Sequence, residues 1–196
     1  MSIKTKNEIL ALMNETWIYE AIVTTRDSDG EMRAAPMGVS TPDFEHIILE
    51  VYKTSKTSKN IINEKKFIIN FVVYVELFWK TVIHENLEFD NLGHLKDSDA
   101  WIEAEVEKVE EAGEKIKVYS KISDYRIINL NFVLINRAKY LALESIINFT
   151  KPDLLKSKNE IKENLRAIKK VAPDSKYEKI VEEILKKIEK HIQANS

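Results

Sequence analysis

The chain has 196 residues, of which 44% are hydrophobic and 32% charged, and a formal net charge of -2, which is typical of a folded protein with one substantial core. The near-neutral charge argues against a nucleic-acid-binding protein, and the absence of cysteine excludes disulfides, thiolate catalysis and cysteine-ligated zinc. The sequence shows neither a signal-peptide pattern nor a run of about 20 apolar residues, so we expect a cytoplasmic protein that does not cross a membrane.

Strands are predicted for most of the first two thirds of the chain. β-branched and aromatic residues, the turn DSDG and a second extended segment form a hairpin pattern. A third strand, a short helix and a fourth strand follow. The predicted strands are 17–25 (WIYEAIVTT), 32–40 (MRAAPMGVS), 46–52 (HIILEVY) and 67–74 (FIINFVVY), and the helix is 58–66 (SKNIINEKK).

A second hairpin is predicted from residue 101 to residue 123, with its turn at Gly113. Its first strand, WIEAEVEKVEE, alternates apolar residues with glutamates, so one face is expected to be buried and the other solvated. The glutamates expected on the solvated face are Glu103, Glu105 and Glu107. The segment 85–100 between the two halves is predicted to be a loop.

From Asn136 the apolar period becomes helical, and helices are predicted at 136–151, 157–171 and 175–192. We therefore expect a first domain at 1–135 and a helical segment at 136–196. The last helix carries an apolar stripe, which we expect to pack onto the first domain or onto a partner chain. The stripe consists of Tyr177, Ile180, Val181, Ile184, Leu185, Ile188 and Ile192.

Motifs for common catalytic chemistries are missing from the sequence. The histidines are scattered, and HENLE lacks the second histidine of a helical zinc-hydrolase motif. Neither GxSxG, GxGxxG nor GxxxxGK[ST] occurs. No metal site is predicted, and catalytic residues stay unassigned.

Hydroxyl and lysine side chains alternate in the segment KTSKTSK, directly before the short predicted helix. Such a segment has two interpretations. Ser or Thr before a helix is an ordinary N-cap, with the lysines facing solvent. Alternatively, hydroxyls, a lysine and the free N–H groups of the helix start form a phosphate-binding loop.

The order of AIVTTRDSDGEMRAAPMGVS, IILEVYKTSKTSKNI and KKFIINFVV resembles the FMN-binding split-barrel superfamily, which includes flavin reductases and pyridoxamine-phosphate-oxidase-like proteins. Within it, the sequence is most similar to an archaeal family of split-barrel flavoproteins. The resemblance covers about the first 150 residues, including NRAKYLALESIINFTK. It implies a mainly β protein with α: an FMN-binding split β-barrel followed by a C-terminal helical segment.

The resemblance also implies flavin-binding residues. In the family pattern, Ala35, Pro36, Met37 and Gly38 run beside the isoalloxazine ring, and Asn70 occupies a polar strand position near the flavin. Arg137 matches a helix-start arginine, with a salt bridge to Glu144 as the alternative. The residues implied to hold the FMN phosphate are Lys53, Thr54, Ser55 and Thr57; which loop lysine faces the phosphate stays open.

The leading functional hypothesis is an FMN-dependent oxidoreductase of flavin-reductase type that takes electrons from a nicotinamide cofactor or another donor. The alternative is a non-catalytic flavin-binding or protein-interaction module. A third interpretation, that the loop binds nucleic-acid phosphate, is disfavoured by the near-neutral charge. The apolar run 67–83 and the resemblance predict a homodimer with FMN at its interface, unless the C-terminal helices cover this run within one chain.

Overall fold

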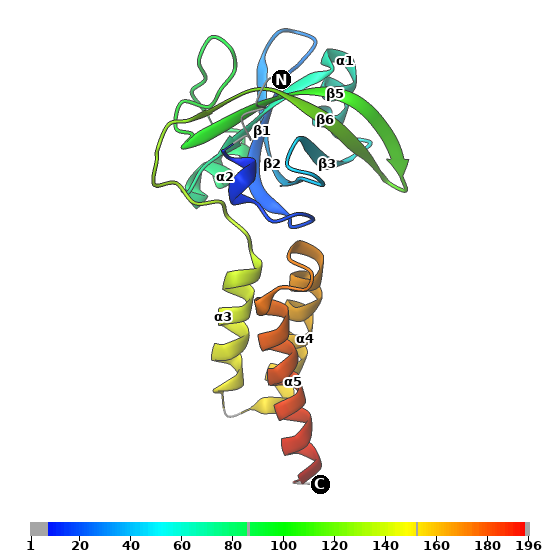
Figure 1. Cartoon of the computed structure of the whole chain (residues 1–196), viewed down its shortest axis with the longest axis vertical. Helices are drawn as coiled ribbons and strands as arrows, with labels where there is room; N and C mark the ends of the chain where they lie inside the picture. Colours follow the sequence, from blue (N-terminus) through cyan, green and yellow to red (C-terminus); the bar gives the residue numbers. More distant parts are fainter. Residues whose placement is uncertain (1–7, 86, 152, 195–196) are drawn as a thin grey trace, which may run out of the picture. The chain divides into compact units, whose positions relative to one another are not determined.

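The computed structural model describes residues 8–85, 87–151 and 153–194 and groups them into two compact units (Figure 1). The first unit holds residues 8–15 and 19–135, and the second holds residues 16–18 and the described residues from 136 onward. None of the helices in the described ranges is long and apolar enough to span a membrane.

Six antiparallel strands form a closed barrel in the order β1-β2-β3-β6-β5-β4. Apolar side chains from alternate strand positions fill its interior, among them Val23, Leu49, Ile69, Ile102 and Val118. The long hairpin of β5 and β6 turns at Gly113, as predicted, where φ is +61° (Figure 1). The strands are β1 (Tyr19–Arg26), β2 (Met32–Ser40), β3 (His46–Tyr52), β4 (Lys66–Phe71), β5 (Ala100–Ala112) and β6 (Lys115–Ile127).

The barrel is weakly closed between β2 and β3. β2 pairs with β1 from Met32 to Val39, but only Val39 and Ser40 pair with β3. Within the described ranges, the part of β2 from Met32 to Gly38 therefore has a strand neighbour on one side only. This open stretch contains all four β2 residues that the resemblance places beside a flavin.

The first predicted strand begins later than expected. β1 starts at Tyr19, whereas Trp17 and Ile18 pack against the core of the helical unit. The backbone N–H of Ile18 donates to the carbonyl of Val171 at 2.9 Å. Trp17 and Ile18 are residue types that favour strands, but they pack against a helical core that lies more than a hundred residues later in the chain.

The fourth predicted strand is too long. β4 ends at Phe71, and the N–H of Val73 donates to the carboxylate of Asp99 at 3.0 Å. Helix α2 (Val75–Val82) follows, and its side chains at Val75 and Trp79 are exposed. The continuous apolar run hides this helix in the sequence because its buried and exposed faces are both apolar.

Two of the glutamates predicted to be solvated have protein partners. Glu103 is 33% exposed, and its carboxylate accepts a hydrogen bond from the ring of His94 at 2.7 Å. Glu105 and Glu107 are exposed, and the carboxylate of Glu107 lies 3.5 Å from Nε2 of His46. The alternation of β5 correctly places Ile102 and Ala104 in the core, but a loop folds back over the face that carries Glu103.

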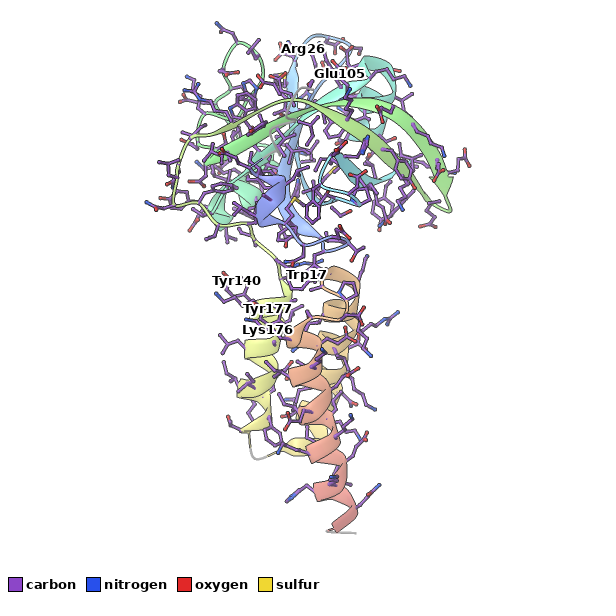
Figure 2. The ribbon with its side chains drawn as sticks, in the orientation of Figure 1. Trp17, Arg26, Glu105, Tyr140, Lys176 and Tyr177 are labelled. Carbon is purple, nitrogen blue, oxygen red and sulfur yellow. The ribbon has the colours of Figure 1, made fainter. Side chains whose placement is uncertain are left out.

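The second unit contains α3 (Ala138–Phe149), α4 (Leu154–Val171) and α5 (Lys176–Ala194) (Figure 1). The predicted stripe of α5 is largely buried among these helices: Val181, Ile184 and Ile188 belong to one core with residues of α3 and α4. At the end of this core, Trp17 lies beside Tyr177, with ring centroids 6.2 Å apart (Figure 2). The three helices thus provide most of the packing surface that the stripe needs.

Candidate functional site

Besides a cavity of about 250 Å³, the barrel unit has one of about 650 Å³, which we call the larger cavity. Residues 30–35, at the start of β2, line one side. Helix α1 (Lys56–Glu64) contributes Lys56 and Thr57, and the end of α2 contributes Lys80, Thr81 and the two residues His84 and Glu85 that follow it. Leu87 and Phe89 close an apolar side. A cavity of this volume, with apolar walls and a few polar groups, is typical of a small-molecule or cofactor site.

The hydroxyl and lysine loop contains the predicted N-cap, and its binding of a phosphate stays a prediction. Ser55 is the N-cap of α1, since its hydroxyl accepts the N–H of Ser58 at 3.1 Å. The ammonium group of Lys53 donates to the carboxylate of Glu111 at 2.6 Å, and this hydrogen bond lowers the pKa of Glu111. Thr54 is exposed, whereas Thr57 is buried and lines the cavity. Of the four residues implied to hold a phosphate, only Thr57 is a lining residue.

Two lysines that line the cavity have no ion-pair partner among the described residues. The ammonium groups of Lys56 and Lys80 form no ion pair with any carboxylate in the described part of the chain. Arg33 is different, because its guanidinium binds Asp27 at 2.8 Å and thereby lowers the pKa of that carboxyl. The carboxylates of Glu31 and Glu85 also line the cavity. The cavity is therefore lined by charges of both signs, and Lys56 and Lys80 are its candidate anion ligands.

The residues that the resemblance places near the flavin ring differ in position. Ala35 lines the cavity, and Pro36, Met37 and Gly38 continue β2 beyond it. Asn70 is fully buried. Its amide nitrogen donates to the carbonyl of Ile22 at 3.1 Å and to the hydroxyl of Thr24 at 3.2 Å. The side chain of Asn70 thus joins parts of the barrel, and contact with a flavin stays a prediction.

Arg137 belongs to the helical unit, where it is exposed at the N-cap position of α3. Its role as a flavin ligand and the alternative ion pair with Glu144 both stay predictions.

A smaller cavity of about 250 Å³ lies elsewhere in the barrel unit. Arg26 and Glu105, which Figure 2 labels close to each other, are among its lining residues, and Met32 lines both cavities. The guanidinium of Arg26 donates to the carbonyl of Gly30 at 2.7 Å, so it helps to fold the β1–β2 turn.

Sequence reasoning missed the contribution of α2 and of residues 87 and 89 to the larger cavity. Lys80 and His84, like Thr81 and Glu85, are spaced by four residues, which places each pair on one side of a helical turn. This polar spacing could have indicated a helix, but the apolar residues around it suggested a strand.

The closed barrel followed by C-terminal helices has the flavin-reductase-like split-barrel fold, as predicted. The chain belongs to the family described as a protein of unknown function (DUF447), because the family's N-terminal domain matches residues 19–129. This match confirms the family resemblance found in the sequence.

Solved structures with the same fold include an FMN-bound DUF447 protein from Methanosarcina mazei. It is 18% identical with a TM-score of 0.55, and the match covers 92% of this chain and 100% of that one. The flavin reductase PheA2 in its native state is 14% identical with a TM-score of 0.51, covering 65% and 88% of the two chains. An FMN-binding protein from Thermus thermophilus with bound 1-cyclohex-2-enone is 11% identical with a TM-score of 0.50, covering 65% and 80%.

Proposed function

We propose that this protein binds FMN in the larger cavity and acts as an FMN-dependent oxidoreductase of flavin-reductase type. The observation that carries this proposal is the cavity of about 650 Å³, whose lining includes the apolar residues Leu87 and Phe89 and two lysines that form no ion pair within the described residues. The FMN reported in the Methanosarcina mazei protein, which has the same fold, supports it.

The phosphate end of FMN is best placed at the start of α1. Thr57 and Lys56 line the cavity there, and Lys80 supplies a second positive charge from α2. Charge-assisted hydrogen bonds to phosphate are stronger than neutral ones, so these groups favour FMN over riboflavin. Ser55 and Lys53 act on the shape of the loop, because Ser55 caps α1 and Lys53 binds Glu111.

The apolar end of the cavity suits the flavin ring. Ala34 and Ala35 of β2 leave room for a flat ring, and Leu87 and Phe89 keep water away from it. FMN supplies the electron-transfer chemistry when it is bound. The contribution of the protein is to orient the ring, to hold the phosphate and to exclude solvent.

A homodimer with the flavin at its interface is part of the proposal. The open stretch of β2 and the exposed apolar side chains of α2 favour a second copy of the chain as the covering surface. Those exposed side chains include Val75, Trp79 and Val82, which are 68%, 61% and 54% exposed. Light scattering after size exclusion, with and without FMN over a concentration series, tests this part. If FMN contacts both copies, it raises the dimer fraction, and a monomer with full FMN affinity contradicts the shared site.

The visible spectrum of the purified protein, followed by titration with FMN and with riboflavin, tests flavin binding. We expect Lys56→Met and Lys80→Met each to weaken FMN by about 1 to 3 kcal/mol, with little effect on riboflavin. Lys59→Met is the matched control, since Lys59 is exposed on α1 and is not a lining residue. A protein that takes up no FMN contradicts the proposal.

Anaerobic stopped-flow mixing of the FMN-loaded protein with NADH and with NADPH tests the reaction. Bleaching of the oxidised flavin band is the result expected of a nicotinamide-linked reductase. If neither donor reduces a flavin that dithionite reduces readily, another donor or the non-catalytic flavin-binding module is favoured.

A further inference from the structure

One wall of the larger cavity belongs to a loop without regular secondary structure. We call residues 87–95 the wall loop. Its residues Leu87 and Phe89 line the cavity, and its last residue, Leu95, is buried in the core beneath them. A single β-bridge pairs Phe89 with Leu95, so the loop folds back on itself. The position of this loop therefore decides the shape of the apolar end of the cavity.

The barrel holds the wall loop through buried polar contacts. The amide oxygen of Asn70 accepts the N–H of Leu95 at 2.9 Å, and the hydroxyl of Thr24 donates to the carbonyl of Gly93 at 2.9 Å. Inside the loop, one carboxylate oxygen of Asp90 accepts the N–H groups of Leu92, Gly93 and His94 at 2.9 to 3.0 Å.

His94 provides a further link between the loop and the barrel. Its side chain is only 5% exposed, with Nδ1 2.8 Å from a carboxylate oxygen of Asp90 and Nε2 2.7 Å from Glu103 of β5. The ring stacks on Trp101 with centroids 3.9 Å apart. Carboxylates only accept hydrogen bonds, so both contacts are satisfied together when each ring nitrogen carries a proton.

We propose that His94 is a positioning residue for the flavin cavity. By binding Asp90 within the loop and Glu103 on the barrel, it fixes the wall loop and so sets the positions of Leu87 and Phe89. His94 acts through these two residues and is not itself a lining residue of the larger cavity. This inference rests on the FMN binding proposed above.

The chain contains a matched control in His46. Its Nδ1 lies 2.6 Å from Asp43 and its Nε2 lies 3.5 Å from Glu107, which is also on β5. His46 therefore has the same kinds of partners as His94, but its side chain is 34% exposed and it does not line the larger cavity. Comparing the two histidines separates the loss of a histidine–carboxylate pair from the loss of the wall loop's attachment.

The first experiment compares His94→Phe and His46→Phe in the full chain. Phenylalanine retains a ring to stack on Trp101 but cannot donate to either carboxylate. We expect His94→Phe to raise the Kd for FMN by about tenfold, because the wall loop loses hydrogen bonds to two carboxylates, and His46→Phe by less than about twofold. At saturating FMN, the visible circular dichroism of the bound flavin should change in His94→Phe only. Equal effects of the two substitutions on Kd overturn the proposal.

Amide hydrogen exchange without FMN tests the attachment of the loop directly. In His94→Phe, exchange should accelerate within residues 87–95 and stay unchanged in β1, whereas His46→Phe should leave residues 87–95 unchanged. If His94→Phe does not fold, Glu103→Gln replaces it, with Glu107→Gln as its control. Because this substitution removes only the charge, we expect a two- to fivefold rise in the Kd for FMN, which corresponds to about 1 kcal/mol or less. Unchanged exchange at residues 87–95 overturns the proposal. A wild-type protein that does not bind FMN contradicts the proposed function instead, and the exchange comparison still tests the role of His94.

Discussion

Replacing Gly93 with alanine tests how the wall loop is seated on the barrel. Gly93 has φ of +99°, a conformation that side chains with a Cβ rarely adopt. A Cβ at this position would also lie 2.4 Å from Cε and 2.9 Å from Sδ of Met32. The substitution therefore imposes backbone strain and displaces the end of a flexible side chain.

The expected magnitude has two parts. Strained backbone at a residue other than glycine costs about 1 to 3 kcal/mol. Moving Met32 from its preferred rotamer adds about 0.5 to 1.5 kcal/mol, since methionine adapts more readily than other apolar side chains. Gly30→Ala is the matched control for the first part, because Gly30 has φ of +86° and no atom within 4 Å of the added Cβ.

Urea denaturation of the three proteins gives the free energies of unfolding. We expect Gly93→Ala to lose more stability than Gly30→Ala, and the difference to report the displacement of Met32. Because Met32 also lines the larger cavity, FMN affinity should fall in Gly93→Ala. A Gly93→Ala protein within about 0.5 kcal/mol of the wild type refutes this reasoning, since changes of that size are usual for neutral surface substitutions.

Three further predictions concern other parts of the molecule. The hydrogen bond from Arg33 lowers the pKa of Asp27 below its ordinary value of 3.8, so the contribution of Asp27 to stability is present above that pH and is lost as the pH falls through the folded pKa. In an acid titration, the free energy of unfolding of Asp27→Asn should therefore fall less steeply with pH than that of the wild type. Asn70→Ala should cost about 1 to 3 kcal/mol for each buried partner left without a hydrogen bond, measured by urea denaturation, and an unchanged midpoint would contradict its role in the barrel. Ile188→Ala should lower the free energy of unfolding of the helical unit by about 2 to 5 kcal/mol, and Ile180→Ala, at a half-exposed position, should lower it far less. Equal melting temperatures of the two variants would show that the stripe is not packed as described.

Most of the barrel could be predicted from local sequence patterns. The bounds of β2 and β3 agree with the predicted segments, and the predicted short helix lies over α1, displaced by two residues. Each of these elements has turn residues at its ends and a side-chain pattern that its own segment reveals. The family resemblance added the closure of these strands into a split barrel, which alternation alone does not specify.

The candidate site was only partly predictable. Thr57 and Ala35 could be found because they lie in segments that resemble the family pattern. Lys56 was part of the same motif, but nothing local distinguishes it from Lys53, which turns away to bind Glu111 on the β5 strand. A lysine's direction depends on which carboxylate lies nearby after folding, and Glu111 is 58 residues away in the chain.

Local sequence patterns specify the succession of strands and helices outside residues 75–82, because turn chemistry and apolar periodicity act within about ten residues. Tertiary packing was needed to show where Trp17 and Ile18 are buried, that residues 75–82 form a helix, and that His94 lies between Asp90 and Glu103. Trp17 and Ile18 have partners that are distant in sequence, and local periodicity does not distinguish the faces of residues 75–82. The partners of His94 are only four and nine residues away, but the wall loop must fold onto β5 before the ring can reach both. The free energy of burial and of buried hydrogen bonds depends on these distant partners, which become neighbours only when the barrel and the helical core have formed.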